Sequence, residues 1–277
     1  MHQLLALMTS DHLLVRCELD RVRTMVAPFP QDLTVGMGAY DDDVVCLRRY
    51  GANIDKAEAW NVPPSDVAMF EAQSVPLEWG VEENTAPFRH RQWLFSGVGT
   101  VDSEAAVRER LMQGVPDFLG RVVRGRRLGE AVFAAYLTEL REVGRMEDAR
   151  LDSPLAAQLL GRTLKRLQTA AADAGTFGRP AFSAVASNGQ LLVAARVGQE
   201  PLFFTLLEGE STCVRCGLDA GTVGRPEHES LSREHRRRKT VVLASNPARA
   251  QGWQEIPDGS ALCVTRSLDV QLLRAAV

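Results

Sequence analysis

The hydrophobic and polar positions near the start of the chain predict a strand, a helix and two further strands. Residues 1–8 contain a short apolar run, which is typical of a buried strand. The carboxylate of Asp11 is well placed to cap a helix over residues 12–25, where apolar residues recur at near-helical spacing. Residues 33–40 and 44–49 then read as two strands around an acidic turn.

The middle of the chain changes from strands to helices. Residues 66–71 and 77–81 are weaker strand candidates, and residues 91–95 form a short apolar run that predicts another strand. The helical pattern that follows predicts three helices: residues 103–112 with Ser103 as a cap, residues 128–143, and a helix opened by Ser153 and Pro154.

The last third of the chain returns to strands. An Asn188-Gly189 turn between two apolar segments predicts a β-hairpin. The strands expected here cover residues 181–185, 190–196, 202–207, 240–244 and 261–265. Because hairpins dominate over strand–helix–strand units, we predict an α+β fold with two mostly antiparallel sheets between layers of helices.

Two glycines in the second predicted strand leave one of its faces without side chains. Gly36 and Gly38 alternate along residues 33–40. This pattern suits a close backbone approach. The group that approaches this bare face is either another part of the protein or a ligand.

Composition and charge narrow the class of protein. The chain has 277 residues, of which 45% are hydrophobic and 24% charged, and a formal net charge of −3. This charge favours neither nucleic acid nor a membrane surface as a partner. No signal peptide or membrane-spanning run is recognisable, and the odd number of cysteines, 5, argues against a secreted disulfide scaffold. We therefore expect a cytoplasmic protein.

Four stretches together resemble a known family. They are MHQLLALMTSDHLLVRCELDRVR, VGMGAY, ENTAPFRHRQWLFSGVGTV and VVLASNPARAQGWQEIPDGSALCV. Their order and spacing resemble the class II glutamine amidotransferases of the N-terminal-nucleophile hydrolase superfamily, specifically the stand-alone type related to the ergothioneine-pathway amidohydrolase. The resemblance implies a single domain over residues 1–277. It also implies a four-layer αββα sandwich with the first strand at the centre of one sheet.

The resemblance places the catalytic centre at positions that have lost their chemistry. The family's nucleophilic cysteine falls on His2, which cannot form the thioester intermediate, and the large second residue favours retention of Met1. The family's oxyanion hole falls on residues 95–99, where Gly99 is kept but Val98 replaces the asparagine donor. Loss of one such donor costs a factor of about 10²–10³ in rate. The loop of Asn84 to Phe88 likewise keeps its shape without the family's polar group.

The substrate clamps implied by the resemblance are also replaced. The arginine that holds the glutamine carboxylate falls near Glu71, and the aspartate that holds the ammonium group falls on Leu128. A buried site without these partners rejects a zwitterion, because the ligand's charges lose water without compensation.

Two functions remain open. The first is a pseudoenzyme, inactive at the vestigial positions His2, Val98, Gly99 and Leu128. It would bind, regulate or assemble with a protein partner, an active relative or a second copy of itself, through an apolar patch, and would need no cofactor. The second is a repurposed hydrolase or ligand-binding protein with His2 in a new role. Its open pocket would be lined by His2, Glu71, Asn84, Gly97, Gly99 and Arg127.

A separate set of residues has metal-ligand chemistry. Cys213 and Cys216 form a CxxC pair, and His228 and His235 follow downstream. Two thiolates and two imidazoles are a suitable tetrahedral set for zinc. The alternative is a pair of free thiols in a loop. The nearby basic run, residues 233–239, lacks interleaved aromatic residues for base stacking, so we expect a solvated loop and no nucleic acid.

Overall fold

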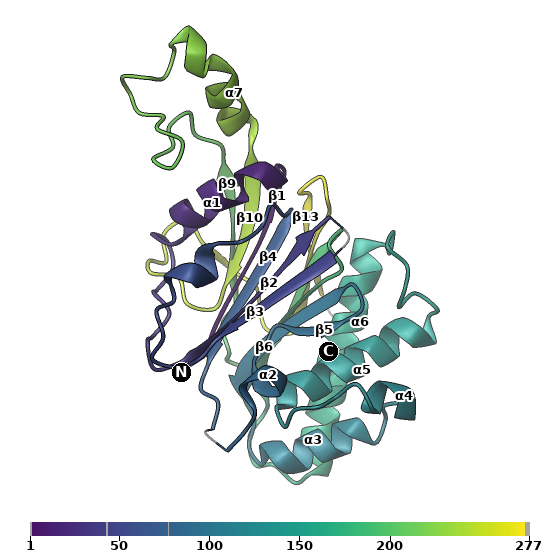
Figure 1. Ribbon diagram of the computed structural model, residues 1–277. Helices are drawn as coiled ribbons and strands as arrows, with labels where there is room; N and C mark the ends of the chain where they lie inside the picture. Colours follow the sequence, from purple (N-terminus) through teal and green to yellow (C-terminus); the bar gives the residue numbers. More distant parts are fainter. Residues whose placement is uncertain (1, 43, 77, 275–277) are drawn as a thin grey trace.

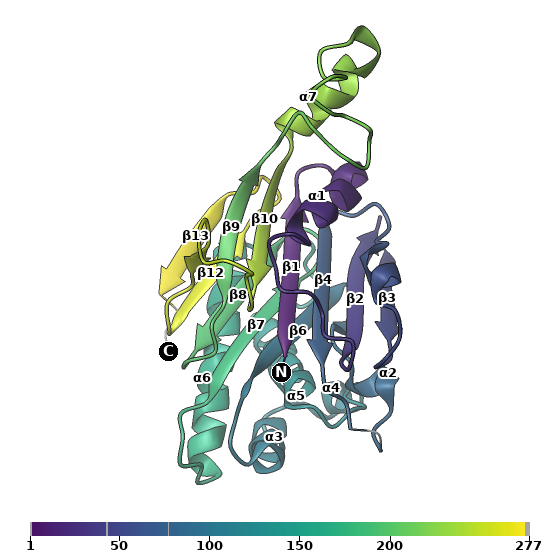
Figure 2. The ribbon, with the colours of Figure 1, turned by 90° about the vertical axis from the view of Figure 1, so that its left-hand side faces the viewer.

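A computed structural model describes residues 2–42, 44–76 and 78–274 of the chain. Two β-sheets lie face to face, and helices cover their outer faces (Figure 1; Figure 2). The strand pairs in these described residues run antiparallel. The predicted α+β sandwich of two antiparallel sheets is confirmed.

The seven-stranded sheet has β1 at its centre. Its strand order is β11-β9-β10-β1-β4-β2-β3, and each residue of β1 is buried (Figure 2). Its strands are β1 (Gln3–Thr9), β2 (Thr34–Asp41), β3 (Val44–Tyr50), β4 (Val67–Gln73), β9 (Phe203–Glu208), β10 (Lys239–Ala244) and β11 (Gln254–Glu255). The central position implied for the first strand is therefore confirmed.

The six-stranded sheet has the order β13-β12-β8-β7-β6-β5. Its strands are β5 (Phe88–His90), β6 (Trp93–Thr100), β7 (Ala181–Ser187), β8 (Leu192–Val197), β12 (Ser260–Val264) and β13 (Val270–Arg274). The predicted Asn188-Gly189 hairpin joins β7 to β8, and Gly189 has a φ of +86° there. Glycine tolerates this left-handed conformation because it has no Cβ.

Helices cover both outer faces. One apolar cluster joins α5 and α6 to the six-stranded sheet, a second covers the outer face of the seven-stranded sheet under α1, and a third fills the space between the sheets. The helices are α1 (Val15–Val22), α2 (Val81–Asn84), α3 (Glu104–Met112), α4 (Asp117–Gly120), α5 (Leu128–Glu142), α6 (Ser153–Asp173) and α7 (Glu229–Arg237), with 3-10 turns η1 (His12–Leu14), η2 (Ala57–Trp60) and η3 (Pro226–His228). No helix among the described residues is long and apolar enough to cross a membrane.

Two predicted elements were wrong in type or length. Residues 78–81 form no strand, because the backbone turns where Trp79 N donates to Pro76 O at 2.9 Å and α2 begins at Val81; Leu77 lies outside the described residues. The helix predicted over residues 12–25 is a 3-10 turn followed by α1, which ends at Val22. Asp11 caps this turn as predicted, accepting a hydrogen bond from Leu13 N at 3.0 Å.

Two predicted caps were also wrong. Ser103 precedes α3 with a φ of +54° and its side chain makes no capping hydrogen bond. Asp152, rather than Ser153, caps α6, because its Oδ2 accepts from Leu155 N at 3.2 Å. The basic run is not a loop either: most of it lies on α7, and Arg238 is buried beside Glu18.

Candidate functional site

The structure brings six of the predicted site residues to one small cavity. It lies at the end of the sandwich where β1 begins, and its volume is about 20 Å³. The predicted residues that line it are His2, Glu71, Gly97, Gly99, Arg127 and Leu128. They come from β1's start, β4, β6 and the start of α5, so the segments matched by the family resemblance do converge. A cavity of this size has room for about one water molecule.

Glu71, on β4, places its carboxylate against β6, the strand on which the family resemblance places the oxyanion hole. Its Oε2 accepts a hydrogen bond from Gly97 N at 3.0 Å, and the side chain is buried. Burial raises the pKa of Glu71 to about 7, an effect that the positive charge of Arg127 and the Gly97 hydrogen bond reduce. A protein carboxyl group therefore already uses one backbone donor of this strand.

His2 is a neutral imidazole beside a guanidinium group. Its Nε2 lies 3.4 Å from Arg127 Nη2, and arginine can only donate, so Nε2 accepts. Burial, and after it the positive charge of Arg127, lower the pKa of His2 to about 4. Arg127 also donates from Nη1 to Ser74 O at 3.2 Å, which fixes its position.

The cavity lacks thiol, hydroxyl and amine nucleophiles. Its described lining includes no cysteine, serine, threonine or lysine side chain. Leu128 is buried, and its backbone N donates to Glu104 Oε1 at 3.0 Å; the family resemblance places the ammonium clamp at this position. The arrangement supplies two carboxylates, one guanidinium and one neutral imidazole in a nearly filled space.

Two predicted site residues lie elsewhere. Val98 is fully buried in the apolar cluster between the sheets, because alternation along β6 turns it away from Gly97 and Gly99. Asn84 supports a loop instead: its Oδ1 accepts from Arg126 N at 2.7 Å and its Nδ2 donates to Gly80 O at 2.9 Å. Neither residue is among those that line the small cavity.

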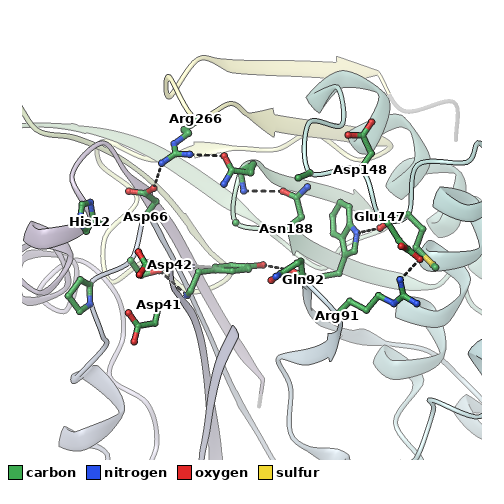
Figure 3. A pocket seen from close by; sticks show the side chains of 18 residues that line it. His12, Asp41, Asp42, Asp66, Arg91, Gln92, Glu147, Asp148, Asn188 and Arg266 are labelled. Carbon is green, nitrogen blue, oxygen red and sulfur yellow. Dashed lines mark hydrogen bonds and ion pairs between the residues drawn. The ribbon is translucent and has the colours of Figure 1, made fainter. Parts of the chain in front are cut away.

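A much larger cleft opens at the other end of the sandwich, where β1 ends. Its volume is about 890 Å³, and its walls come from both sheets (Figure 3). Arginine and carboxylate groups pair along it: Arg91 with Glu147, and Arg266 with Asp66 at 3.1 Å. Sequence reasoning missed this cleft, because its polar residues are distributed over distant loops without a recognisable motif.

The metal-ligand residues form a cluster that differs from the predicted set. Cys213, Cys216 and His235 lie together, and Cys17 of α1 is the fourth member. Their ligand atoms all lie within 4.8 Å of one another. His228 does not belong to this cluster. No sequence signal connects Cys17 to a CxxC pair that follows it so much later in the chain.

Comparison with solved structures finds the same fold in glutamine amidotransferases. The glutamine aminotransferase class-II domain protein from Silicibacter pomeroyi matches with a TM-score of 0.62 and 20% identity, over 99% of this chain and 100% of that chain. The predicted glutamine amidotransferase from Pseudomonas aeruginosa matches with a TM-score of 0.57 and 13% identity, over 97% and 98%.

A larger enzyme contains the same fold as part of its chain. The glutamine phosphoribosylpyrophosphate amidotransferase from B. subtilis matches with a TM-score of 0.56 and 12% identity, over 98% of this chain and 49% of that chain. At these identities the matches show the fold, and they agree with the resemblance of the sequence. No protein-family model and no curated protein sequence matches the chain.

Proposed function

We propose that this chain is a non-catalytic glutamine amidotransferase-like protein that acts by binding a partner. The amidotransferase fold supplies a stable scaffold, while the positions matched to the nucleophile, the oxyanion donor and both substrate clamps carry other residues. Loss of one group reduces a rate, but loss of all four removes both the chemistry and the recognition of glutamine.

One observation supports this proposal above the others: the Glu71 carboxylate occupies the site. It lies where the family resemblance expects the arginine that holds the substrate carboxylate, and it accepts the Gly97 N–H bond at 3.0 Å. A carboxylate at this position would repel the carboxylate of glutamine instead of binding it. It also takes up the Gly97 N–H, so this backbone donor is not free to bind a substrate.

The alternative, a repurposed enzyme or ligand-binding protein that uses the same pocket, is disfavoured by size. Drug-sized ligands occupy pockets of about 300–1,000 Å³, whereas the His2 cavity measures about 20 Å³. The cleft of about 890 Å³ at the opposite end has the volume for a ligand and is where small-molecule binding would be sought.

A glutamine hydrolysis assay tests the proposal. Ammonia release from glutamine is measured for the full chain, for His2→Ala, and for an active class II amidotransferase as positive control. We expect the full chain and His2→Ala to be equally inactive. Turnover by the unaltered chain that falls at least about tenfold in His2→Ala would contradict the proposal, because it would give His2 a catalytic role.

A second variant separates a missing nucleophile from a missing site. We expect His2→Cys to remain inactive even after methionine removal, because Glu71, Val98 and Leu128 are unchanged. Restored hydrolysis in His2→Cys would show that the remaining site still recognises glutamine. That result would restrict the loss of function to residue 2.

The partner in this proposal is a protein, either an active relative or a second copy of the chain. The large exposed apolar side chains lie on different elements and do not define the predicted patch; they include Leu13, Phe118, Phe177, Val214 and Leu272. Light scattering on the purified chain distinguishes a homodimer from a monomer. Co-purification with an active amidotransferase, competed by the untagged chain, tests the other partner.

A further inference from the structure

The connection between β9 and β10, residues 209–238, projects from the sandwich with almost no apolar core (Figure 1; Figure 2). None of its residues belongs to the three apolar clusters, and Leu218 is its one buried apolar side chain. Small segments without a core usually depend on a disulfide, a metal ion or a partner for their structure. We refer to residues 209–238 as the extension.

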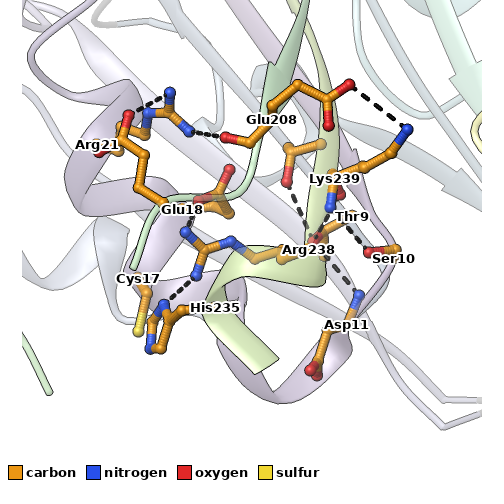
Figure 4. A network of polar contacts seen from close by, with 12 residues as sticks. Thr9, Ser10, Asp11, Cys17, Glu18, Arg21, Glu208, His235, Arg238 and Lys239 are labelled. Carbon is orange, nitrogen blue, oxygen red and sulfur yellow. Dashed lines mark hydrogen bonds and ion pairs between the residues drawn. The ribbon is translucent and has the colours of Figure 1, made fainter. Parts of the chain in front are cut away.

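The extension meets the sandwich at a cluster of three thiols and one imidazole. Cys213 and Cys216 lie in a tight turn closed by the backbone bridge between Cys213 and Leu218. Cys17 is supplied by α1, and His235 by α7 (Figure 4). Cys17 and His235 are buried. All the cysteines in the described chain are free thiols, so no disulfide performs the fastening role.

The distances within the cluster match those of a tetrahedral metal centre. Cys17 Sγ lies 3.5 Å from Cys216 Sγ, and His235 Nε2 lies 3.3 Å from Cys216 Sγ. A tetrahedral zinc ion with Zn–S bonds of about 2.3 Å holds its sulfur ligands about 3.8 Å apart. The two contacts at Cys216 are therefore within a few tenths of an ångström of this spacing, and since no two ligand atoms are more than 4.8 Å apart, shifts of about 1 Å or less bring the four around one ion.

We propose that Cys17, Cys213, Cys216 and His235 bind one Zn²⁺ ion that fastens the extension to α1. A Cys₃His set fills all four positions, which is typical of structural rather than catalytic zinc. Binding converts the thiols to thiolates and releases their protons to solvent. The ion replaces the apolar core that the extension lacks.

Ion pairs beside the cluster hold the same two elements together. Arg215 of the extension donates to both carboxylate oxygens of Asp20 at 2.7 and 3.0 Å, and Arg21 pairs with Glu210 at 2.6 Å. These pairs are partly exposed and each contributes little alone. They bring the CxxC turn to the face of α1 that presents Cys17, so the ligands are assembled by the fold.

The second ring nitrogen of His235 has a defined environment. Its Nδ1 lies 2.6 Å from Arg238 Nη1, whose Nη2 is paired with buried Glu18 at 2.5 Å (Figure 4). Because a guanidinium only donates, Nδ1 accepts here and Nε2 carries the proton. Zinc at Nε2 would require the ring proton on Nδ1, so the Arg238 guanidinium would have to give way to a hydrogen-bond acceptor at that position.

Metal content of the full chain, purified without a histidine tag and under reducing conditions, tests the proposal. We expect native mass spectrometry and elemental analysis to find one zinc per chain. Added Co²⁺ should give the thiolate charge-transfer and tetrahedral absorption bands of a sulfur-rich site. A reduced chain that binds neither ion, or one that purifies with a Cys17–Cys216 disulfide and no metal, would overturn it.

Matched variants identify the ligands. We expect Cys17→Ser and His235→Ala to lose nearly all zinc, since ligand removal opens a closed structural site. Cys46→Ser and His228→Ala alter the same residue types outside the cluster and should keep one zinc per chain. Zinc retained at full stoichiometry and affinity in Cys17→Ser, or lost in His228→Ala, would contradict this ligand set.

Limited trypsin digestion keeps the proposal testable if a variant folds poorly. Arg215, Arg233 and Arg236 are exposed cleavage sites within the extension. We expect 1,10-phenanthroline to accelerate cleavage at these sites at least tenfold and added Zn²⁺ to reverse the effect, while the sandwich stays intact. Cleavage unaffected by both reagents would overturn the fastening role. Neither outcome depends on whether the chain hydrolyses glutamine.

Discussion

Three side chains form a polar contact in the small cavity near the start of β1. Arg127 donates toward the neutral imidazole of His2, and its charge also acts on the buried carboxyl group of Glu71. The positive group precedes α5 and the negative group lies on β4, so both charges of this contact come from the protein itself. A zwitterionic ligand would have to separate them.

At this scale we predict that Glu71 makes the stability of the protein depend on pH. Its pKa rises from 4.5 to about 7 on folding, mainly through burial. The folded state therefore holds this proton more tightly, so the contribution to the free energy of unfolding is full below about pH 4.5 and is lost as the pH rises through 7. Glutamine does not titrate. As the pH rises from 5 to 8, we therefore expect the free energy of unfolding of Glu71→Gln to increase by about 2 kcal/mol relative to that of the unaltered chain.

Urea unfolding of both proteins at the two pH values measures this difference. The pKa of His2 moves the other way, from 6.5 to about 4, but His2 is present in both proteins and its effect cancels to first order. The exposed Glu109→Gln is the control. A stability difference between Glu71→Gln and the unaltered chain that stays constant with pH would show that Glu71 ionises as easily in the folded state as in the unfolded state.

Among the elements, β2 shows how a strand and a loop pack without side chains between them. A Cβ on Gly36 would overlap the carbonyl oxygen of Ala86, and Pro87 Cδ lies 3.1 Å from the same point. The sequence left open whether the bare face of this strand meets protein or ligand, and the structure shows that it meets the loop before β5. This loop is the one in which the family resemblance placed a polar group.

We predict that Gly36→Ala is destabilising. The obstructing atoms belong to backbone, which cannot rotate away, so we expect the free energy of unfolding to fall by about 1–3 kcal/mol. Gly120→Ala on α4 is the control, because the nearest atom to its added Cβ is Met112 Cε at 3.9 Å. Urea unfolding monitored by circular dichroism compares the two; equal stabilities would mean that the loop after α2 moves freely.

For the whole molecule, Tyr40 connects the two sheets. It belongs to β2 of the seven-stranded sheet, and its Oη lies 2.8 Å from Ser187 O, at the end of β7, and 2.9 Å from Gln92 O, in the turn before β6 of the other sheet. The turn at Gly189 packs closely on the Tyr40 ring: a Cβ added to this glycine would lie 3.0 Å from Tyr40 Cδ1. The hydroxyl therefore anchors one end of the sandwich, beside the large cleft.

We predict that Tyr40→Phe lowers the free energy of unfolding by about 1–2 kcal/mol, because the single O–H donor that the carbonyl oxygens of Ser187 and Gln92 share is then lost. Tyr50→Phe is a matched control, since its hydroxyl donates to Glu58 O at 3.0 Å at an exposed site. We expect Tyr50→Phe to lower the free energy of unfolding by less than about 0.5 kcal/mol. Thermal unfolding of both variants is the measurement. If the stability of Tyr40→Phe equals that of the unaltered chain, apolar packing alone aligns the sheets.

Much of the fold could be predicted because its signals are local. The apolar run of β1 and the Asn188-Gly189 turn are properties of adjacent residues, and both were confirmed. The failures had local competitors: Ser103 adopts a positive φ that moves its hydroxyl away from the helix, and Asp152 supplies a charged acceptor one residue before Ser153. The strand β13, which completes the sheet edge, has a weak pattern and was missed.

The amino-acid sequence by itself determines which side-chain groups stand at given positions: a histidine at position 2 has no thiol and a valine at position 98 has no amide in any fold. Which groups meet in space was a different matter. The contact of Glu71 with Gly97 N–H, the closure of the cavity to about 20 Å³ and the joining of Cys17 to the CxxC turn all depend on the order and register of paired strands. These contacts join residues far apart in the chain, so only the packed sheets could determine them.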